Sequence, residues 1–160
     1  MNPCVPKSFP PLPFPPITMG NLKVKLAETA EEVLAVQALR YEIFVGEVGA
    51  KPTPEMEQVK RDFDKFDPYC DHMLVIATTD GKEEIVGTYR LLRRSRMGEL
   101  GQFYSEDEFD IGELKKMPGE IVELGRSCVR EDFRSKAAMQ LLWRGEIGRA
   151  SCRERVSSPV

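Results

Sequence analysis

Glu123-Leu-Gly-Arg-Ser-Cys-Val129, followed by Arg130-Glu-Asp-Phe-Arg134 and the apolar run 137–143, is the stretch that decides the fold. The first segment predicts a strand with charged side chains near its start, the second a short basic turn, and the third the opening of a helix. The first amides of a helix have no partner inside it and lie at the positive end of its dipole. Such a helix start binds anions, and phosphate is the ligand we expect here.

The composition fits one ordinary domain behind a leader. Of 160 residues, 41% are hydrophobic, which is enough to form a core. Seven of the twelve prolines fall in the first sixteen residues, and proline favours extended backbone. We therefore expect a disordered leader over 1–20 and the domain over 21–145. The leader lacks the apolar segment of a secretory signal and no other segment could span a bilayer, so we expect a cytoplasmic protein.

Residues 146–160 have a different character. Residues 146–156, Glu-Ile-Gly-Arg-Ala-Ser-Cys-Arg-Glu-Arg-Val, are what a widely used sequencing adapter would encode. We therefore predict that the natural reading frame stops near Gly145 and that 146–160 is a non-native tail, to be left out of fold reasoning. A genuine polar C-terminal tail is the alternative.

The cysteines and the net charge argue against two classes of protein. The four cysteines are Cys4, Cys70, Cys128 and Cys152. They form no C-x-x-C pair and His72 is the single histidine, so we expect free thiols and no metal site. A net charge of −3 argues against a nucleic-acid partner, because basic residues gather only within 90–96.

Strand and helix patterns alternate along the domain. Leu22-Lys-Val-Lys-Leu26 alternates as a half-buried strand does, Thr29 and Glu32 form a capping box, and Asp80-Gly81 is typical of a hairpin turn. The expected elements are strand 22–26, helix 27–45, short helix 55–60, strands 72–78 and 85–92, short helix 111–116, strand 120–130 and a helix from 137. This order favours an α/β fold, with a mixed, mostly antiparallel central sheet flanked by helices.

Arg40 interrupts the apolar face of the helix expected over 27–45. One interpretation lays its stem along the core and keeps its charged head in water. The other uses the guanidinium to hold a carboxylate or phosphate, or to pair with an internal acid. Residue type alone leaves both open.

A run of acids follows this helix, with aromatic residues between them. The acids are Asp62, Asp64, Asp67 and Asp71. Their spacing lacks the glycine and the glutamate of a calcium loop. A solvated acidic turn is one interpretation. The other is that the aromatic residues partly bury the carboxylates, which then need partners, and Arg40, Arg90 and Arg126 are available.

Four motifs in one order resemble a known pattern. They are Arg40-Tyr-Glu-Ile-Phe44, Asp64-Lys-Phe-Asp67, Val86-Gly-Thr-Tyr-Arg90-Leu-Leu92 and Glu123-Leu-Gly-Arg126. They are similar to the pattern shared by acyl-homoserine-lactone synthases and ornithine-lipid N-acyltransferases, both of the acyltransferase superfamily with the GNAT fold. Segments 70–75, 101–104, 108–110 and 123–129 resemble the ornithine-lipid branch, often labelled hemolysin-like. The resemblance covers about residues 22–143 and implies the N-terminal portion of that fold.

The resemblance implies an N-acyltransferase of lyso-ornithine lipid synthesis. Such an enzyme moves a (3-hydroxy)fatty acyl group from an acyl carrier protein thioester to the α-amino group of ornithine or a similar amino acid. The implied partners are the carrier protein and the amino acid, with peripheral contact at the inner membrane for the lipid product. The superfamily's phosphate turn is commonly Arg-x-x-Gly-x-Gly/Ala, whereas this chain has Arg134-Ser-Lys-Ala-Ala-Met139. Alanine in place of the first glycine favours the phosphopantetheine of a carrier protein over coenzyme A.

Site residues follow from the same resemblance, for attack of a free amine on a thioester. Glu123 is the expected base, directly or through water, with Arg126 beside it, and amides of strand 121–129 would meet the oxyanion. The expected substrate-binding residues are Arg40, Phe44, Asp64, Asp67 and Arg90. The expected donor-binding residues are Val129, Arg134, Ser135, Lys136 and Ala137. A structural ion-pair network is the alternative role of Glu123 and Arg126.

Two other functions stay open. One is an acyl-homoserine-lactone synthase, which would use an adenosylmethionine acceptor. The other lies outside the enzymes and is a membrane-active, hemolysin-like protein or a purely binding protein. The sequence has neither an amphipathic basic helix nor a spanning segment, which argues against lysis.

Overall fold

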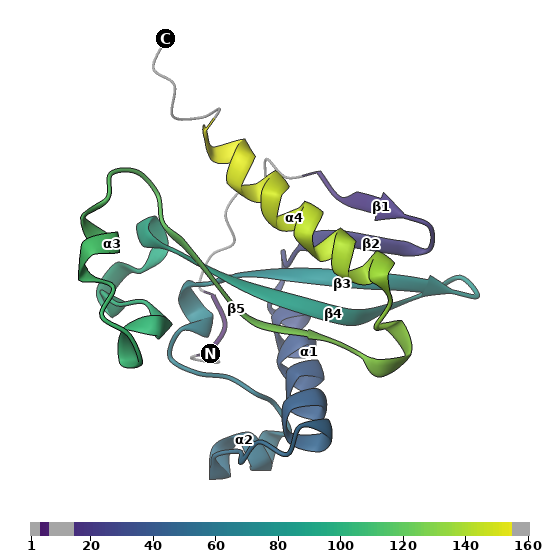
Figure 1. The fold of residues 1–160 in the computed structure, drawn as a ribbon. Coiled ribbons are helices and arrows are strands. Elements are labelled where there is room, and N and C mark those ends of the chain that lie inside the picture. The colour runs from purple at the N-terminus through teal and green to yellow at the C-terminus, as the bar shows by residue number, and fades with distance from the viewer. Residues whose placement is uncertain (1–3, 7–14, 155–160) are drawn as a thin grey trace.

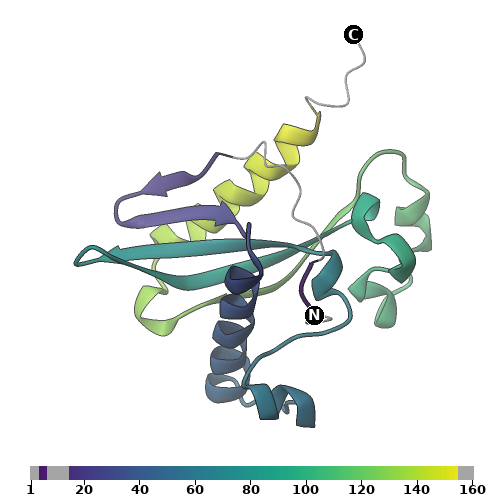
Figure 2. The ribbon, with the colours of Figure 1, turned by 180° about the vertical axis from the view of Figure 1, so that it is seen from behind.

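The computed structural model describes residues 4–6 and 15–154, with side chains up to Gly145. Its elements are β1 (Ile17–Met19), β2 (Leu22–Leu26), α1 (Ala30–Tyr41), α2 (Pro54–Val59), β3 (Asp71–Thr79), β4 (Lys82–Arg93), α3 (Gly112–Lys116), β5 (Val122–Val129) and α4 (Lys136–Glu154). The sheet has the order β1-β2-β3-β4-β5, and its four pairings are antiparallel. Helix α4 crosses one face and α1 lies against the other (Figures 1 and 2). The predicted mostly antiparallel sheet flanked by helices is confirmed.

Local sequence signals account for most of these elements. Thr29 caps α1 by accepting a hydrogen bond from the Glu32 amide at 3.2 Å, as predicted. Asp80 and Gly81 join β3 to β4 with φ values of 51° and 76°, the left-handed backbone that a two-residue hairpin turn requires. The predicted strands and helices are all present, with ends shifted by a few residues.

The N-terminal segment differs in part from the prediction. Ile17–Met19 forms β1 and pairs with β2. Val5 is buried in the cluster on the α1 face of the sheet, and the Cys4 carbonyl accepts a hydrogen bond from Gln37 Nε2 at 2.9 Å. The prediction of a disordered leader is wrong for these residues, because pairing and burial order them. Residues 1–3 and 7–14 lie outside the described residues.

The C-terminal helix extends into the segment predicted to be a non-native tail. Helix α4 continues to Glu154, and residues 155–160 lie outside the described part of the chain. The origin of this segment stays a prediction. No helix in the described part of the chain is long and apolar enough to cross a bilayer.

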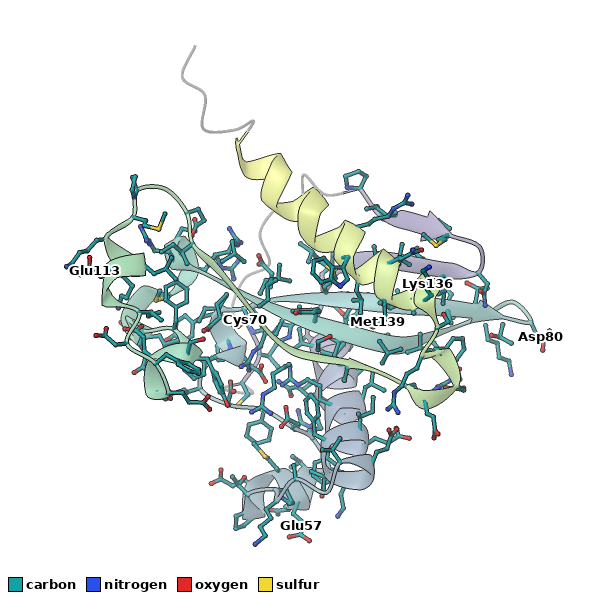
Figure 3. The ribbon with its side chains drawn as sticks, viewed as in Figure 1. Glu57, Cys70, Asp80, Glu113, Lys136 and Met139 are labelled. Atoms are coloured by element: carbon teal, nitrogen blue, oxygen red, sulfur yellow. The ribbon has the colours of Figure 1, made fainter. Side chains whose placement is uncertain are left out.

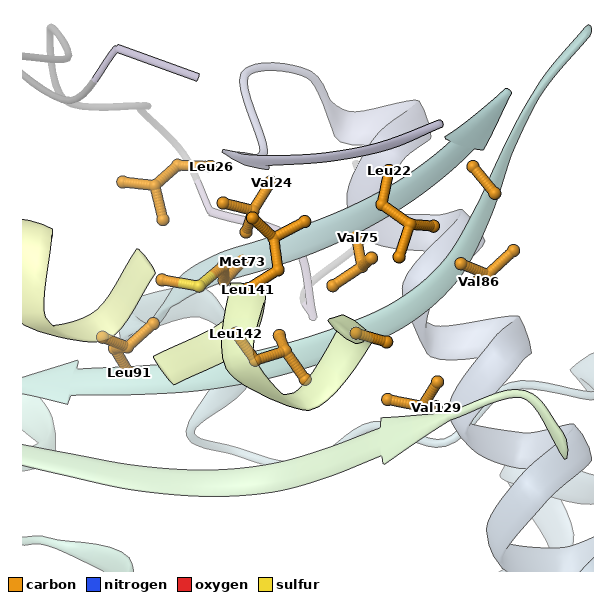
Figure 4. Packing of buried hydrophobic residues seen from close by; sticks show 12 residues of the cluster. Leu22, Val24, Leu26, Met73, Val75, Val86, Leu91, Val129, Leu141 and Leu142 are labelled. Atoms are coloured by element: carbon orange, nitrogen blue, oxygen red, sulfur yellow. The ribbon is translucent and has the colours of Figure 1, made fainter. Parts of the chain in front are cut away.

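Strand β3 is buried on both of its sides. Met73 and Val75 pack in the cluster that includes Leu141 of α4 (Figure 4). The alternate residues Leu74 and Ile76 pack in the cluster that includes α1. Successive side chains of a strand point to opposite faces, so one short apolar run supplies both cores.

Helix α1 continues into one π-helical turn, Glu42–Glu47. The Val48 amide donates to the Ile43 carbonyl, five residues back, at 3.0 Å. Turns of this type widen the helix and occur frequently at functional sites. The turn carries Phe44 and Glu47, which both contact segments far along the chain.

Candidate functional site

Strand β5 is irregular near its middle. Thr88 of β4 pairs with Cys128, but Arg90, two residues on, pairs with Gly125, three residues back. One extra residue of β5 is therefore accommodated in a β-bulge. Arg126 lies in this bulge and has a φ of 51°, which is uncommon for a residue other than glycine. Bulges of this kind change the direction in which a side chain projects.

A cavity of about 320 Å³ lies against the bulge. Its lining residues are Phe44, Phe66, Cys70, Arg90, Leu92, Tyr104, Ser105, Glu123, Leu124, Gly125, Arg126 and Ser127. Cys70, at the end of the acidic segment, is labelled near the centre of Figure 3. Two guanidinium groups and one carboxylate therefore share a cavity with aromatic and aliphatic walls, which suits a ligand with both polar and apolar parts.

Arg90 links the cavity to the acidic segment 62–71. Its Nη1 donates to Asp64 Oδ1 at 2.7 Å and to Asp67 Oδ1 at 2.8 Å. Its guanidinium carbon also lies 5.8 Å from the centre of the Phe66 ring. The predicted pairing of the acidic segment with Arg90 is confirmed.

Arg40 and Asp67 form a buried pair, and both are 0% exposed. Arg40 Nη2 donates to Asp67 Oδ2 at 2.6 Å, and Nε donates to Asp62 Oδ2 at 2.9 Å. Burial raises the pKa of the Asp67 carboxyl, but the charges of Arg40 and Arg90 together with the hydrogen bond from Arg40 more than offset it and hold this pKa below its usual value. The predicted direct contact of Arg40 and Asp67 with substrate is wrong, because burial and mutual pairing keep both away from the cavity wall. Pairing with internal acids is the correct interpretation of Arg40.

Arg126 contacts the acidic segment from the opposite strand. Its Nη1 lies 3.6 Å from Asp62 Oδ1, and its Nη2 lies 3.7 Å from Asp64 Oδ2. Its guanidinium carbon is 5.6 Å from the centre of the Phe44 ring and 5.9 Å from that of Tyr104. The predicted residues Phe44, Asp64, Arg90 and Arg126 are thus brought together around one cavity. These ion pairs are long, so the N–H groups of Arg126 can still donate to a ligand.

Glu123 does not pair with an arginine in the described part of the chain. Its Oε2 accepts a hydrogen bond from the Tyr104 amide at 2.8 Å. Its Oε1 accepts one from the Ser105 amide at 2.8 Å and one from the Ser105 hydroxyl at 2.5 Å. The alternative role, an ion-pair network with the acidic segment, holds for Arg126 but not for Glu123, since a loop supplies the partners of Glu123. Glu123 nevertheless lines the cavity beside Arg126.

The predicted donor-binding residues gather where β5 leads into α4. Arg134 Nε donates to the Val129 carbonyl at 2.8 Å, and Nη2 donates to the Glu47 carboxylate. Arg134 therefore ties the end of β5 to the π-helical turn. Its ion pair with Glu47 is partly exposed to solvent, so an anionic ligand could compete for this guanidinium.

The start of α4 has the predicted form. The Ser135 hydroxyl accepts a hydrogen bond from the Ala138 amide at 3.3 Å and caps the helix. Lys136, labelled in Figure 3, and Ala137 occupy the first turn, whose amides have no partner within the helix. These residues are not part of the cavity wall. Within the described residues the cavity and the helix start are therefore two separate features.

Sequence reasoning missed the contribution of the loop between β4 and β5. Tyr104 and Ser105 line the cavity and belong to a short 3₁₀ helix, η5 (Tyr104–Asp107). The Phe103 amide donates to the Glu106 carboxylate, three residues on, at 2.6 Å. A glutamate at this spacing is a known helix-start signal and could have located the element.

A second buried ion pair was also missed. Arg93 Nε donates to Asp71 Oδ2 at 2.6 Å, and Nη2 donates to Oδ1 at 3.1 Å. Arg93 was noted only as a member of the basic residues within 90–96, and it is 6% exposed. The recurrence of arginine and aspartate at buried strand ends is the signal that could have paired them.

Comparison with known proteins assigns the family. A family model described as an acetyltransferase (GNAT) domain matches residues 39–144. The matched span is most of the chain and includes β3 to β5, the cavity and the first turns of α4. The chain belongs to the GNAT acetyltransferase domain family.

Curated relatives narrow the comparison. The chain is 48% identical over 132 residues to the L-ornithine N(alpha)-acyltransferase of Rhizobium meliloti (strain 1021), covering 79% of this chain and 45% of that protein. It is 44% identical to the protein of the same name from Agrobacterium fabrum (strain C58 / ATCC 33970), with the same coverage. It is 42% identical to that of Brucella abortus (strain 2308), over 79% of this chain and 47% of the relative. The chain spans about half the length of the curated relatives it matches.

A solved structure of TofI, in a ternary complex with an inhibitor and MTA, is also similar. The TM-score is 0.44 at 22% identity, over 69% of this chain and 57% of that chain. Similarity at this level supports no statement about function.

Proposed function

We propose that the full-length protein is an N-acyltransferase that acylates the α-amino group of ornithine in lyso-ornithine lipid synthesis. The observation that carries this proposal is the cavity at the β5 bulge, which places the Glu123 carboxylate and the Arg126 guanidinium on one wall. Relatives at 42–48% identity that share this segment are named L-ornithine N(alpha)-acyltransferase.

The cavity offers groups for both ends of an amino acid. Arg126 is the better candidate for the acceptor's carboxylate, because its ion pairs are 3.6 and 3.7 Å long while Arg90 is committed to Asp64 and Asp67. Glu123 would accept the proton that the amine must lose before it attacks, directly or through water. The site can therefore orient an amino acid by its carboxylate while it activates the amine.

The thioester carbonyl would meet the bulge. Residues 126 and 127 have no partner in the register between β4 and β5, and their amides are candidates to donate to the oxyanion that forms at this carbonyl. Formation of the amide C–N bond then breaks the C–S bond, and the thiolate leaves with the donor. In this mechanism, backbone amides of the bulge stabilise the negative charge of the oxyanion, and the bulge does not have to change its conformation.

The donor would be held at the start of α4. Arg134, Ser135, Lys136 and Ala137, with the Val129 carbonyl already bonded to Arg134, would surround a phosphate at the helix N-terminus. We propose acyl-phosphopantetheine on a carrier protein as the donor and coenzyme A as the less suitable one. Association with the inner membrane from the cytoplasmic side would follow from the lipid product.

The test is a transfer assay with the full-length protein. We expect 3-hydroxyacyl carrier protein to be consumed with ornithine and the product to be N-acylated. Consumption with adenosylmethionine in place of ornithine would indicate a lactone synthase instead, and leakage of liposomes without thioester consumption would indicate a membrane-active protein. The same assay with acyl-coenzyme A of the same chain length, in place of the carrier protein thioester, measures which donor is preferred.

Glu123→Gln tests the assigned base. We expect kcat to fall about 100-fold, since general-base catalysis contributes this order of magnitude. Glu113→Gln is the matched control, because Glu113 lies on the outer edge of the molecule on α3 (Figure 3) and its side chain is 90% exposed. Unchanged turnover of Glu123→Gln would remove the base from the mechanism while leaving the transfer activity established.

A further inference from the structure

Ser105 follows two residues of the loop between β4 and β5 that contact the core. Phe103 is 1% exposed and packs in the cluster that includes Phe66 and Leu92. The Tyr104 ring meets the Phe66 ring edge-on, with 5.5 Å between centres. Burial of Phe103 and the ring contact of the partly exposed Tyr104 therefore tie the residues before Ser105 to the core, next to Glu123.

The two oxygens of Glu123 are engaged unequally. A carboxylate oxygen has two acceptor directions. Oε1 accepts from both the amide and the hydroxyl of Ser105, so both of its directions are used. Oε2 accepts from the Tyr104 amide alone, so one direction is left. Oε2 can therefore accept one more hydrogen bond, or a proton, without displacing an existing hydrogen bond.

We propose that Ser105 is a positioning residue for Glu123, whose hydroxyl fixes the carboxylate so that Oε2 is the proton-accepting oxygen. This inference rests on the proposed function and names a residue outside the motifs that carry the family resemblance. An N–H proton of the acceptor moves to Oε2, the freed electron pair forms the C–N bond, and the C–S bond breaks. The departing thiolate then takes up this proton from Oε2, and Glu123 is ionised again.

Other charges around Glu123 set the background for a pH test. The ionisable residues that share its cavity are Arg90 from β4, Arg126 from β5, Tyr104 from η5 and Cys70 from the end of the acidic segment. The two guanidinium groups keep their charge at all working pH values. Burial raises the pKa of the Cys70 thiol, so it stays neutral. Asp62 and Asp64 of the acidic segment face the same guanidinium groups. The Ser105 hydroxyl donates to Glu123 and not to these acids, so a shift of the acidic limb between wild type and a Ser105 variant reports Glu123.

Ser105→Ala in the full-length protein is the test. We expect kcat with ornithine and the acyl carrier protein thioester to fall about 10-fold, the effect of one hydrogen bond to a charged group, with KM within about 2-fold. The hydroxyl stabilises the ionised carboxylate, so its loss raises the apparent pKa of the base and moves the acidic limb of the rate profile to higher pH. Ser105→Thr keeps the hydroxyl and should recover kcat to within about 3-fold of wild type.

The control is Gln102→Ala. It removes a side-chain hydrogen bond to Asp107 of η5, at 3.2 Å, without touching Glu123, and it should leave kcat and the rate profile unchanged. Wild-type kcat in Ser105→Ala would overturn the proposal. A lower kcat with an unmoved acidic limb would also overturn it, because Ser105 would then only support the loop.

A second readout separates this proposal from the proposed function. If the wild-type protein fails to acylate ornithine, the titration of the Glu123 carboxyl carbon can still be followed by NMR, with its signal assigned by its loss in Glu123→Gln. We expect its pKa to be higher in Ser105→Ala than in wild type. Equal values in the two proteins would refute the positioning role regardless of the reaction.

Discussion

The two faces of the sheet are packed by different chemistry. Among the side chains of α4 that the structure describes, those buried against the sheet are apolar: Ala138, Leu141 and Leu142. Helix α1 also packs through apolar residues in its first half, but it then buries Gln37 and Arg40, both 0% exposed. Arg40 and Gln37 both donate to Asp67 Oδ2. The core directly under α4 is therefore apolar, whereas the core under α1 surrounds a group of charges.

The difference shows which part of the fold is tied to the site. Removing an apolar contact under α4 costs burial and leaves a cavity, with no charge left unpaired. On the α1 face, Asp67 accepts from Arg40 on one oxygen and from Arg90 on the other. Arg90 lines the cavity, so the buried pair orients a cavity residue. Stability and site geometry are therefore coupled under α1.

The largest expected effect comes from Arg40→Met, which breaks the charged core. We expect the free energy of unfolding, measured by urea denaturation of the full-length protein, to fall by about 3–5 kcal/mol, because Asp67 and Asp62 lose a buried partner. Lys25→Met is the control. It removes a lysine that pairs with Glu32 at 2.7 Å, with both side chains partly exposed, and it should cost less than about 1 kcal/mol. Similar decreases in the free energy of unfolding for the two variants would show that the buried ion pairs of Arg40 stabilise the fold no more than a partly exposed pair does.

A smaller effect on the same face concerns pH. His72 is 2% exposed, its Nε2 lies 3.0 Å from the Asp67 carbonyl, and burial lowers its pKa. As the pH falls, the imidazole of His72 is therefore protonated in the unfolded chain before it is protonated in the folded chain. The free energy of unfolding decreases below about pH 6.5, by up to about 1.4 kcal/mol per pH unit. The lowered pKa of Asp67 acts in the same direction but only below about pH 4.

His72→Gln checks this by removing the titration while keeping a side-chain donor. We expect urea midpoints of the full-length wild type to fall between pH 7 and pH 5 by more than those of the variant. Parallel pH profiles for the two proteins would mean that His72 does not titrate differently in the folded and unfolded states.

The smallest effect on stability is expected at the exposed edge of the charged group. Arg126→Gly removes two long ion pairs and also relieves a positive φ that glycine adopts freely. The free energy of unfolding should stay within about 1 kcal/mol of wild type, while kcat/KM for ornithine falls about 100-fold if Arg126 holds the acceptor. A large loss of stability would place Arg126 with Arg40 as a structural residue.

The fold could be predicted closely because local signals agree with it. The Thr29 cap, the Asp80-Gly81 turn and the alternation in strand 22–26 each name their element. Strand Ile17–Met19 was missed, since it is three residues long within a proline-rich segment and is stabilised by pairing with β2. Free thiols were predicted correctly for Cys70 and Cys128.

The site could be predicted only in part, because the type of a residue does not determine whether its side chain is buried. The partners of the acidic segment were found among Arg40, Arg90 and Arg126, since few cations were available to it. Whether Arg40 ends in water or in the core depends on what α1 packs against, which no local pattern states. The loop donors to Glu123 come from 18 and 19 residues away, beyond the reach of any short motif.

The π-helical turn after α1 sets the direction in which its side chains and the following residues project. Phe44 stacks near Arg126 at the cavity, and Glu47 holds Arg134 at the start of α4. Deleting one residue from this turn would restore ordinary helical winding and rotate everything after it by about 100°. Because both contacts are made by this one turn, a single extra residue in a helix sets the spacing between the bulge of β5 and the segment that leads into α4.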